Sequence, residues 1–408
     1  MPFLIWCRQI KTHHNHIRIR SSPMGQLVQR LSQYWNKIQG TLFPFLEEEL
    51  DPLTEKQQQL IAVLELVRIE QFLPYRFGFE GRPQESRSAI ARSFIAKMVY
   101  NMDTTIALLE RLMSDKNIRR ICGWESKTQI PSESTFSRAF AEFANTELPC
   151  RVHDALIKKT ISDDIILHNS RDSTAIDARE KPQVKRADKT DKSNTQDKKK
   201  RGRRRKGEEK PAPEPTRIEK QLTMTIEEML NDLPKACDKG AKKDSKGNTM
   251  YWNGYKLHLD TVDAGIPVSA VITSASVHDS QVAIPLATLS AKKITGLYDL
   301  MDSAYDVPAI IDHSKALGHV PLVDKNPRRN KELKEDIEAE AKARQTLNWQ
   351  PAECMRYNVR STAERANARL KDEFGACKLR VRGHIKVACH LMFGVLVLAA
   401  DQLLRLVI

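Results

Sequence analysis

The chain has 408 residues, of which 40% are hydrophobic and 29% charged, so its composition excludes a wholly disordered or fibrous protein. At roughly 100–200 residues per domain, this length predicts two or three domains. Lys and Arg number 66 against 52 Asp and Glu, and the formal net charge of +14 favours a polyanionic partner, most commonly nucleic acid.

The first part of the chain predicts helices. Residues 1–23 are basic and lack the order of a signal peptide, and Met24 opens a clearer helical pattern, so we interpret 1–23 as an N-terminal extension of uncertain start. From 24 to 160, apolar side chains such as Leu60 and Val63 recur at helical spacing. We predict an all-helical N-terminal domain over 24–160 that binds DNA.

One segment of this region has two interpretations. A short helix that ends near Cys122 is followed by a turn and by a helix that Ser132 or Ser134 could cap. This pattern is typical of a DNA-binding helix-turn-helix, and an ordinary helical hairpin fits it equally well.

The pattern changes after residue 162. Residues 164–176 predict a β-strand, and a basic low-complexity stretch over 181–210 follows, with 14 Lys and Arg against 5 Asp and Glu. Because this stretch has almost no apolar side chains with which to build a core, we expect a disordered basic loop, 181–215, inserted into the following domain.

Strands and helices then alternate. This order predicts an α/β fold with a mixed sheet covered by helices, the arrangement of a ribonuclease H-like domain, over 161–408. The topology alone establishes no chemistry. The expected strands are 254–262, 266–277, 297–302 and 319–323, and the expected helices are 280–292, 309–317, 331–344, 353–375 and 385–406.

Three carboxylates stand out by position. Asp172 lies within the first strand, Asp302 ends the strand 297–302, and Glu364 lies on the penultimate helix. A charge in a strand is costly unless it is paired, and hard oxygen ligands suit Mg²⁺ or Mn²⁺. Two such ions could activate water against a phosphodiester. Taken alone, each Asp is better explained as an exposed residue at a strand end, and the nearby competitors are Asp177, Asp299 and Asp306.

The helix around Glu364 strengthens this interpretation. At about 100° per residue, Tyr357, Arg360, Glu364 and Lys371 lie on one face of a continuous helix. A carboxylate beside phosphate-binding groups suits phosphoryl transfer, although a solvated face with a Glu–Arg pair is common. The opposite face is predicted to bury against the sheet through Ala363, Ala366 and Leu370.

The same four residues form a known signature. Tyr357-x2-Arg360-x3-Glu364-x6-Lys371 matches, at every spacing, the Y-R-E-K motif, so the chain resembles bacterial insertion-sequence DDE transposases of the insertion-sequence-four-like type. The stretches that start at Arg171 (R-D-S-T) and at Asp302 (D-x-x-Y-D) resemble the motifs of that family's first and second Asp. The resemblance extends from about residue 25 to the C-terminus and is weakest in the basic loop.

The resemblance implies an activity. A transposase of this type cuts double-stranded DNA at the terminal inverted repeats of its element and joins the ends to target DNA, usually as a homodimer, in the bacterial cytoplasm. Asp172, Asp302 and Glu364 would bind two Mg²⁺ or Mn²⁺ ions, and Tyr357, Arg360 and Lys371 would contact DNA. A catalytically inactive DNA-binding derivative and a metal-dependent endonuclease without strand transfer are the alternatives.

The basic loop offers a second DNA contact. Arg201, Arg203, Arg204 and Arg205 resemble a minor-groove hook without its usual proline. We favour an arm that neutralises phosphates without reading sequence, and the alternative is a solvated linker.

The remaining sequence features bear on the cellular compartment of the protein. Seven single cysteines without a C-x2-C pair argue against a zinc site and against a secreted disulfide framework. The longest apolar run, 391–400, is shorter than the ~20 residues that span a bilayer, so we predict a buried core helix and no membrane partner.

Overall fold

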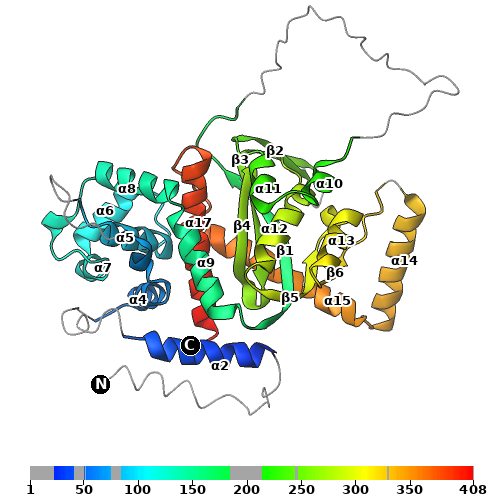
Figure 1. Cartoon of the computed structure of the whole chain (residues 1–408), viewed down its shortest axis with the longest axis horizontal. Coiled ribbons are helices and arrows are strands. Elements are labelled where there is room, and N and C mark those ends of the chain that lie inside the picture. The colour runs from blue at the N-terminus through cyan, green and yellow to red at the C-terminus, as the bar shows by residue number, and fades with distance from the viewer. Residues whose placement is uncertain are drawn as a thin grey trace, which may run out of the picture.

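The structure, a computed structural model, describes residues 23–40, 50, 52–74, 84–183, 214–243, 247–328 and 330–407. Within them, helices come first and a region built on one mixed sheet follows, which confirms the predicted α/β class (Figure 1).

The N-terminal region is made of capped helices. The helix α4 (Glu55–Val67) begins with a capping box between Thr54 and Gln57, and its predicted apolar stripe, including Leu60 and Val63, is fully buried. Between α7 (Lys116–Ile121) and α8 (Glu133–Asn145) lies one 3₁₀ turn, η3 (Lys127–Gln129), and the helix-turn-helix and hairpin interpretations both stay predictions. The other helices are α2 (Pro23–Ile38), α5 (Arg87–Val99), α6 (Thr105–Ser114) and α9 (Leu148–Ile161).

The region after residue 162 is built on one mixed sheet, and the order of the sheet's strands in space was not predicted. With β2 (Asp238–Lys243) at one edge, its strands run β2-β3-β1-β5-β6, and β4 also pairs with β3. The strands β4, β3 and β1 are antiparallel neighbours, whereas β1, β5 and β6 are parallel. The strands are β1 (Ile165–Asp177), β3 (Thr249–Val262), β4 (Ile266–Ser274), β5 (Thr295–Met301) and β6 (Val320–Val323), with α12 (Ala283–Ala291) and α13 (Pro308–Ala316) as the connecting helices.

Three elements are absent from the sequence prediction. The strand β2 (Asp238–Lys243) pairs with the start of β3, and its charged sequence has low β-propensity, which is typical of an edge strand. The short helices α10 (Arg217–Gln221) and α11 (Ile226–Asp232) begin with Thr-x-x-Glu capping boxes. These boxes are visible in the sequence, so the two helices could have been predicted.

The predicted single helix over 353–375 is wrong in detail. It is divided into α15 (Ala352–Tyr357), the 3₁₀ turn η7 (Asn358–Arg360) and α16 (Ser361–Asp372), after α14 (Lys331–Leu347). Asn358 and a β-branched Val359, both weak helix formers, occupy the tightened turn. The backbone stays right-handed helical at Tyr357, Asn358 and Arg360, so the side-chain directions change little across the turn.

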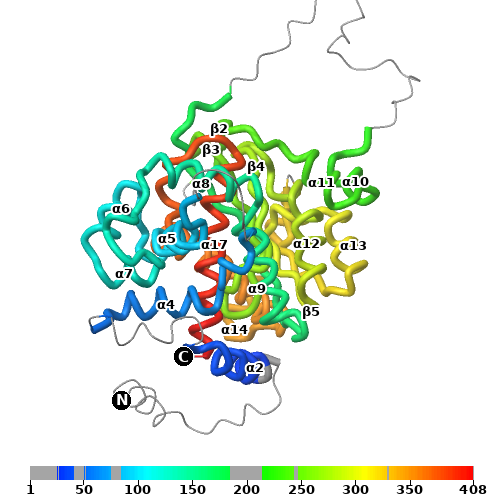
Figure 2. Tube along the Cα trace, turned by 60° about the vertical axis from the view of Figure 1, so that its left-hand side comes forward, coloured from blue at the N-terminus to red at the C-terminus, as the bar shows by residue number. Residues whose placement is uncertain are grey.

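The last helix, α17 (His384–Arg405), joins the two regions. It packs against α4, α5, α8 and α9 on one side and against β4 on the other (Figures 1 and 2). By length and composition it is the one helix within the described ranges that could cross a membrane, but 89% of its most apolar stretch is buried inside the protein. The predicted core helix is thus confirmed, and one hydrophobic core runs through the helices and the sheet. The domain boundary at 160/161 stays a prediction.

Candidate active site

Two of the three predicted carboxylates are positioned by the neighbouring parallel strands β1 and β5. Asp172 is on β1, and Asp302 directly follows β5, where it caps the 3₁₀ turn η6 (Ser303–Tyr305) and accepts a hydrogen bond from Ala304 N at 2.9 Å. The register pairs Ser170 with Leu300, so two residues further on Asp172 and Asp302 come level with each other. The parallel topology therefore brings the two side chains close together where β5 ends, at the middle of β1.

Both carboxylates are poorly compensated. Burial raises the pKa of Asp172, and the nearby charge of Asp302 raises it further. Burial likewise raises the pKa of Asp302, to which the charge of Asp279 adds. The guanidinium of Arg360 acts on both carboxyls in the opposite direction without reversing either shift. Two carboxylates whose negative charge is unfavourable would gain from a bound cation.

The third carboxylate is engaged by an arginine. Glu364 lies in the first turn of α16 and accepts a hydrogen bond from Arg360 Nη2 at 2.6 Å. Its side chain is 54% exposed. No group of three or more His, Cys, Asp or Glu side chains within the described ranges is close enough to hold a metal ion. The structure thus brings Asp172 and Asp302 together but leaves Glu364 outside a closed ligand set.

The other residues of the motif lie along the same segment. The Tyr357 ring is 5.7 Å from the Arg360 guanidinium, and its hydroxyl donates to Asp324 at 2.6 Å, a partner that the sequence did not predict. Lys371 is half-buried on α16, where burial lowers its pKa against the opposing charge of Asp177 at the end of β1. Arg360 therefore lies at the carboxylates, whereas Lys371 lies nearer the strand end.

The face of α16 that covers the sheet also carries a polar residue. Ala363, Ala366 and Leu370 are fully buried, as predicted, and α16 packs on β1 and β3. Asn367, on the same helix, donates from Nδ2 to Asp172 Oδ2 at 2.9 Å. Sequence reasoning missed this residue, although its position three residues after Glu364 was an available signal.

A fourth acid lies close to the pair. Asp279 follows β4 and accepts a hydrogen bond from Lys256 Nζ at 3.0 Å. Lys256 also donates to the Val277 carbonyl at 2.8 Å. Burial opposes the charge of Asp279, but Lys256 and His258 outweigh it and leave the pKa of this carboxyl below its ordinary value. Asp279 is therefore an ionised acid with its own partner.

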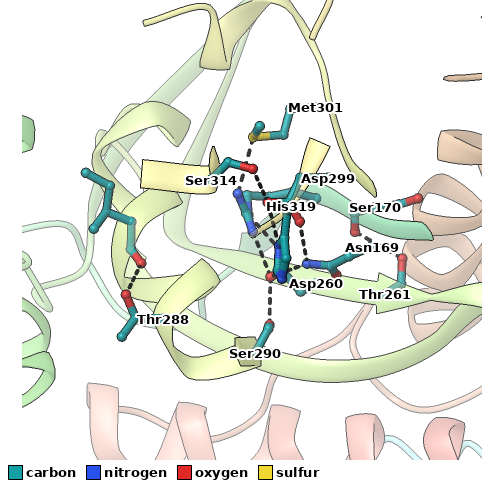
Figure 3. Close-up of polar contacts among 12 residues, drawn as sticks. Asn169, Ser170, Asp260, Thr261, Thr288, Ser290, Asp299, Met301, Ser314 and His319 are labelled. Atoms are coloured by element: carbon teal, nitrogen blue, oxygen red, sulfur yellow. Dashed lines mark hydrogen bonds and ion pairs between the residues drawn. The ribbon is translucent and has the colours of Figure 1, made fainter. Parts of the chain in front are cut away.

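The opposite face of β1 carries a buried charge network (Figure 3). Arg171, only 1% exposed, binds Asp260 of β3 through two hydrogen bonds of 2.8 and 2.9 Å. Asn169 donates to both Asp260 and Asp299 at 3.2 Å. His319 contacts Asp299 at 3.1 Å, and the network is completed by hydroxyl donors from Ser290 and Ser314. The network ties together β1, β3 and β5, the strands beside the candidate site.

The competing acids have other environments. Asp299 belongs to the buried charge network, Asp306 accepts a hydrogen bond from Asn326 N at 2.9 Å, and Asp177 is exposed at the end of β1. The predicted loop arginines lie outside the described residues: Arg201, Arg203, Arg204 and Arg205.

Two family models match the chain. Residues 171–399, more than half of the chain, match the family described as "Transposase DDE domain". Residues 46–142, within the helical region, match the family described as "Transposase domain (DUF772)". No curated protein and no solved structure matches. The first match begins one residue before Asp172 and includes Asp302 and Glu364, and by its extent the chain belongs to the DDE transposases of insertion sequences.

Proposed function

We propose that this transposase cleaves DNA at the ends of its insertion sequence in a metal-dependent reaction and joins those ends to target DNA. One observation carries the proposal: Asp172 on β1 lies level with Asp302 directly after the neighbouring parallel strand β5, both have raised pKa values, and Glu364 is on the helix that covers β1. The Y-R-E-K spacing supports the insertion-sequence-four-like subtype.

Asp172, Asp302 and Glu364 would hold two Mg²⁺ or Mn²⁺ ions. The residues fit such ions through two poorly compensated carboxylates, and Glu364 completes the set once it leaves Arg360. Bound there, the ions supply activation of the attacking oxygen and stabilisation of the leaving oxygen. Arg360, whose charge already acts on both aspartates, would then bind a phosphate oxygen, and Lys371 and Tyr357 would hold the DNA on either side.

The reaction needs no bond between protein and DNA. A water oxygen attacks the phosphorus at the element end as the bond from phosphorus to the 3′-oxygen breaks. This step leaves a 3′-hydroxyl and a 5′-phosphate, and one proton is released. The 3′-hydroxyl then attacks a target phosphate and loses its proton, and the displaced target 3′-oxygen takes one up. The number of phosphorus–oxygen bonds is unchanged in both steps.

The arrangement of the chain suggests how the DNA is held. We assign end binding to the helical region 24–160, which precedes the sheet and contains the second transposase match. A homodimer would pair the two terminal inverted repeats, and the bacterial cytoplasm would be the site of action. The net charge of +14 favours these contacts with duplex DNA.

A single assay tests the activity. A labelled duplex with the terminal repeat found beside the gene is incubated with full-length protein, Mg²⁺ and a target plasmid. We expect both cleaved ends and joined products, and neither with Asp172→Ala. Cleavage without joining would identify an endonuclease, and end binding without cleavage in Mg²⁺ or Mn²⁺ would identify a non-catalytic DNA-binding protein.

A further inference from the structure

Asn367 is a polar side chain in an apolar contact. On α16 its neighbours Ala363, Ala366 and Leu370 are fully buried, and Asn367 itself is only 5% exposed. An apolar residue would fill this place between helix and sheet at a lower desolvation cost. The polar amide therefore requires a local reason.

The amide of Asn367 is only half satisfied. Its nitrogen donates to Asp172 Oδ2 at 2.9 Å, whereas its oxygen Oδ1 is buried and has no hydrogen-bond partner within the described ranges. A mere tie between helix and strand would account for the nitrogen alone. A buried Oδ1 without a partner, which Asn169 also has among the described residues, leaves the amide oxygen of Asn367 free to take a ligand.

The place of Asn367 indicates what that ligand is. Asn367 lies three residues after Glu364 on α16, so both side chains project from one side of the helix. It touches Asp172, whose carboxylate is poorly compensated. A half rotation of the Asn367 amide about its Cβ–Cγ bond exchanges the positions of Nδ2 and Oδ1. The oxygen would repel the carboxylate, unless a cation lies between them.

We infer that Asn367 is a further ligand of the divalent cation at Asp172, to which it presents its Oδ1. Side-chain carbonyl oxygens are common ligands of hard divalent cations. Without the cation, the amide nitrogen holds the Asp172 carboxylate in place. With it, the amide oxygen joins the carboxylate on the ion. The inference rests on the proposed function, because it takes Asp172 as a metal ligand.

The test measures binding of Mn²⁺ alone to the full-length, DNA-free protein by calorimetry, with thermal unfolding in parallel. Asn367→Leu keeps the size of the side chain and removes the oxygen, so we expect Mn²⁺ affinity to fall by about tenfold or more. Asn358→Leu, the same change at an exposed position in η7, is the matched control and should leave the affinity unchanged.

Asn367→Asp is the second variant. A carboxylate there faces Asp172, so the metal-free protein should melt at a lower temperature than wild type. Mn²⁺ should restore the melting temperature and bind at least as tightly as to wild type. A residue that only tied helix to strand would show the loss of stability without the rescue.

The outcomes separate the two proposals. If Asp172→Ala abolishes Mn²⁺ binding while Asn367→Leu binds as wild type does, the inference about Asn367 is wrong and the metal site stands. If Asp172→Ala binds Mn²⁺ as wild type does, the proposed metal site itself is wrong.

Discussion

The carboxylates on the two sides of β1 differ in how many donors surround them. On one face, Asp260 and Asp299 are fully buried yet surrounded by donors from Arg171, Asn169 and His319. On the other, among the described residues, Asp172 accepts a side-chain hydrogen bond from Asn367, and Asp302 accepts a hydrogen bond from a backbone N–H. Both faces use the same strands and residue type, so the partners make the difference.

The pKa shifts express this difference. Burial raises the pKa of Asp299, but the hydrogen bond from His319 and the charge of Arg171 outweigh it and leave the pKa below its ordinary value. Burial also raises the pKa of Asp172 and Asp302, and there no partner outweighs it. Asp299 is thus compensated by the fold, whereas the pKa values of Asp172 and Asp302 stay raised, a condition that is common at functional sites.

We call the side of β1 that holds Asp172 and Asp302 the uncompensated face, and the side that holds Asp260 and Asp299 the compensated face. The largest effect on cleavage should come from substitutions on the uncompensated face. Asp172→Ala, Asp302→Ala and Glu364→Gln should each reduce cleavage by on the order of 10³-fold or more, because each removes a proposed metal ligand. Binding of the labelled end, measured by gel shift, should stay near wild type. Asp177→Ala is the matched control, since Asp177 is exposed at the end of β1. If Asp177→Ala were inactive and Asp172→Ala active, the first carboxylate would be wrongly assigned.

Substitutions on the compensated face should instead lower the free energy of unfolding. Arg171→Met leaves Asp260 buried and without its ion pair, which should cost about 3–5 kcal/mol of unfolding free energy. Arg171→Met with Asp260→Leu removes both charges, so most of that loss should be recovered. Urea unfolding of the three proteins measures this. Equal losses in the single and double variants would contradict the view that compensation is what stabilises this face.

Much of the uncompensated face could be predicted from the sequence. The strand patterns in the sequence already place Asp172 and Asp302. Helical periodicity, which is a local signal, predicts the buried face of Ala363, Ala366 and Leu370. The partner of Arg171 could not be predicted, since Asp260 is 89 residues away and only the register brings them together. The pairing of Tyr357 with Asp324 is hidden for the same reason.

Substitutions of Arg360 and Lys371, which we propose to contact DNA, should have intermediate effects. Arg360→Ala removes the positive charge that acts on Asp172 and Asp302, and we expect cleavage to fall by roughly 10²-fold with weaker DNA binding. Arg360→Lys should rescue only in part because Lys lacks the planar fork. Lys371→Ala should mainly weaken binding, because Lys371 lies nearer the end of β1. Wild-type cleavage by Arg360→Ala would remove it from the site.

The compensated face should also carry a small pH dependence. The hydrogen bond to Asp299 raises the pKa of His319, so its protonated form is favoured in the folded state. This contribution to stability is complete below the ordinary histidine pKa of about 6.5 and is lost as pH rises through the raised value. The stability advantage of wild type over His319→Asn should therefore be largest near pH 6 and shrink at higher pH. Thermal melts across this range measure it, and an advantage that grows with pH would have the wrong sign.

The smallest effect on the chemistry should come from the basic loop, of which residues 184–213 lie outside the described residues. Residues 181–210 carry 14 Lys and Arg, and the chain on either side, β1 and α10, belongs to the sheet region. Deleting 183–210 should therefore leave Mn²⁺ binding and the melting temperature near wild type. Affinity should fall equally on terminal-repeat and random duplexes, because phosphate contacts carry no sequence information.

A salt series separates this arm from a linker. Each phosphate contact that is lost should make the slope of log K against log salt shallower by up to ~0.9, since fewer counterions are released on binding. Replacing Arg201, Arg203, Arg204 and Arg205 by Ser in the full-length protein is the matched variant, because it keeps the length of the loop. It should reproduce a large part of the change in slope. An unchanged slope in both variants would identify the segment as a linker, and DNA affinity would then depend on the folded residues around the uncompensated face.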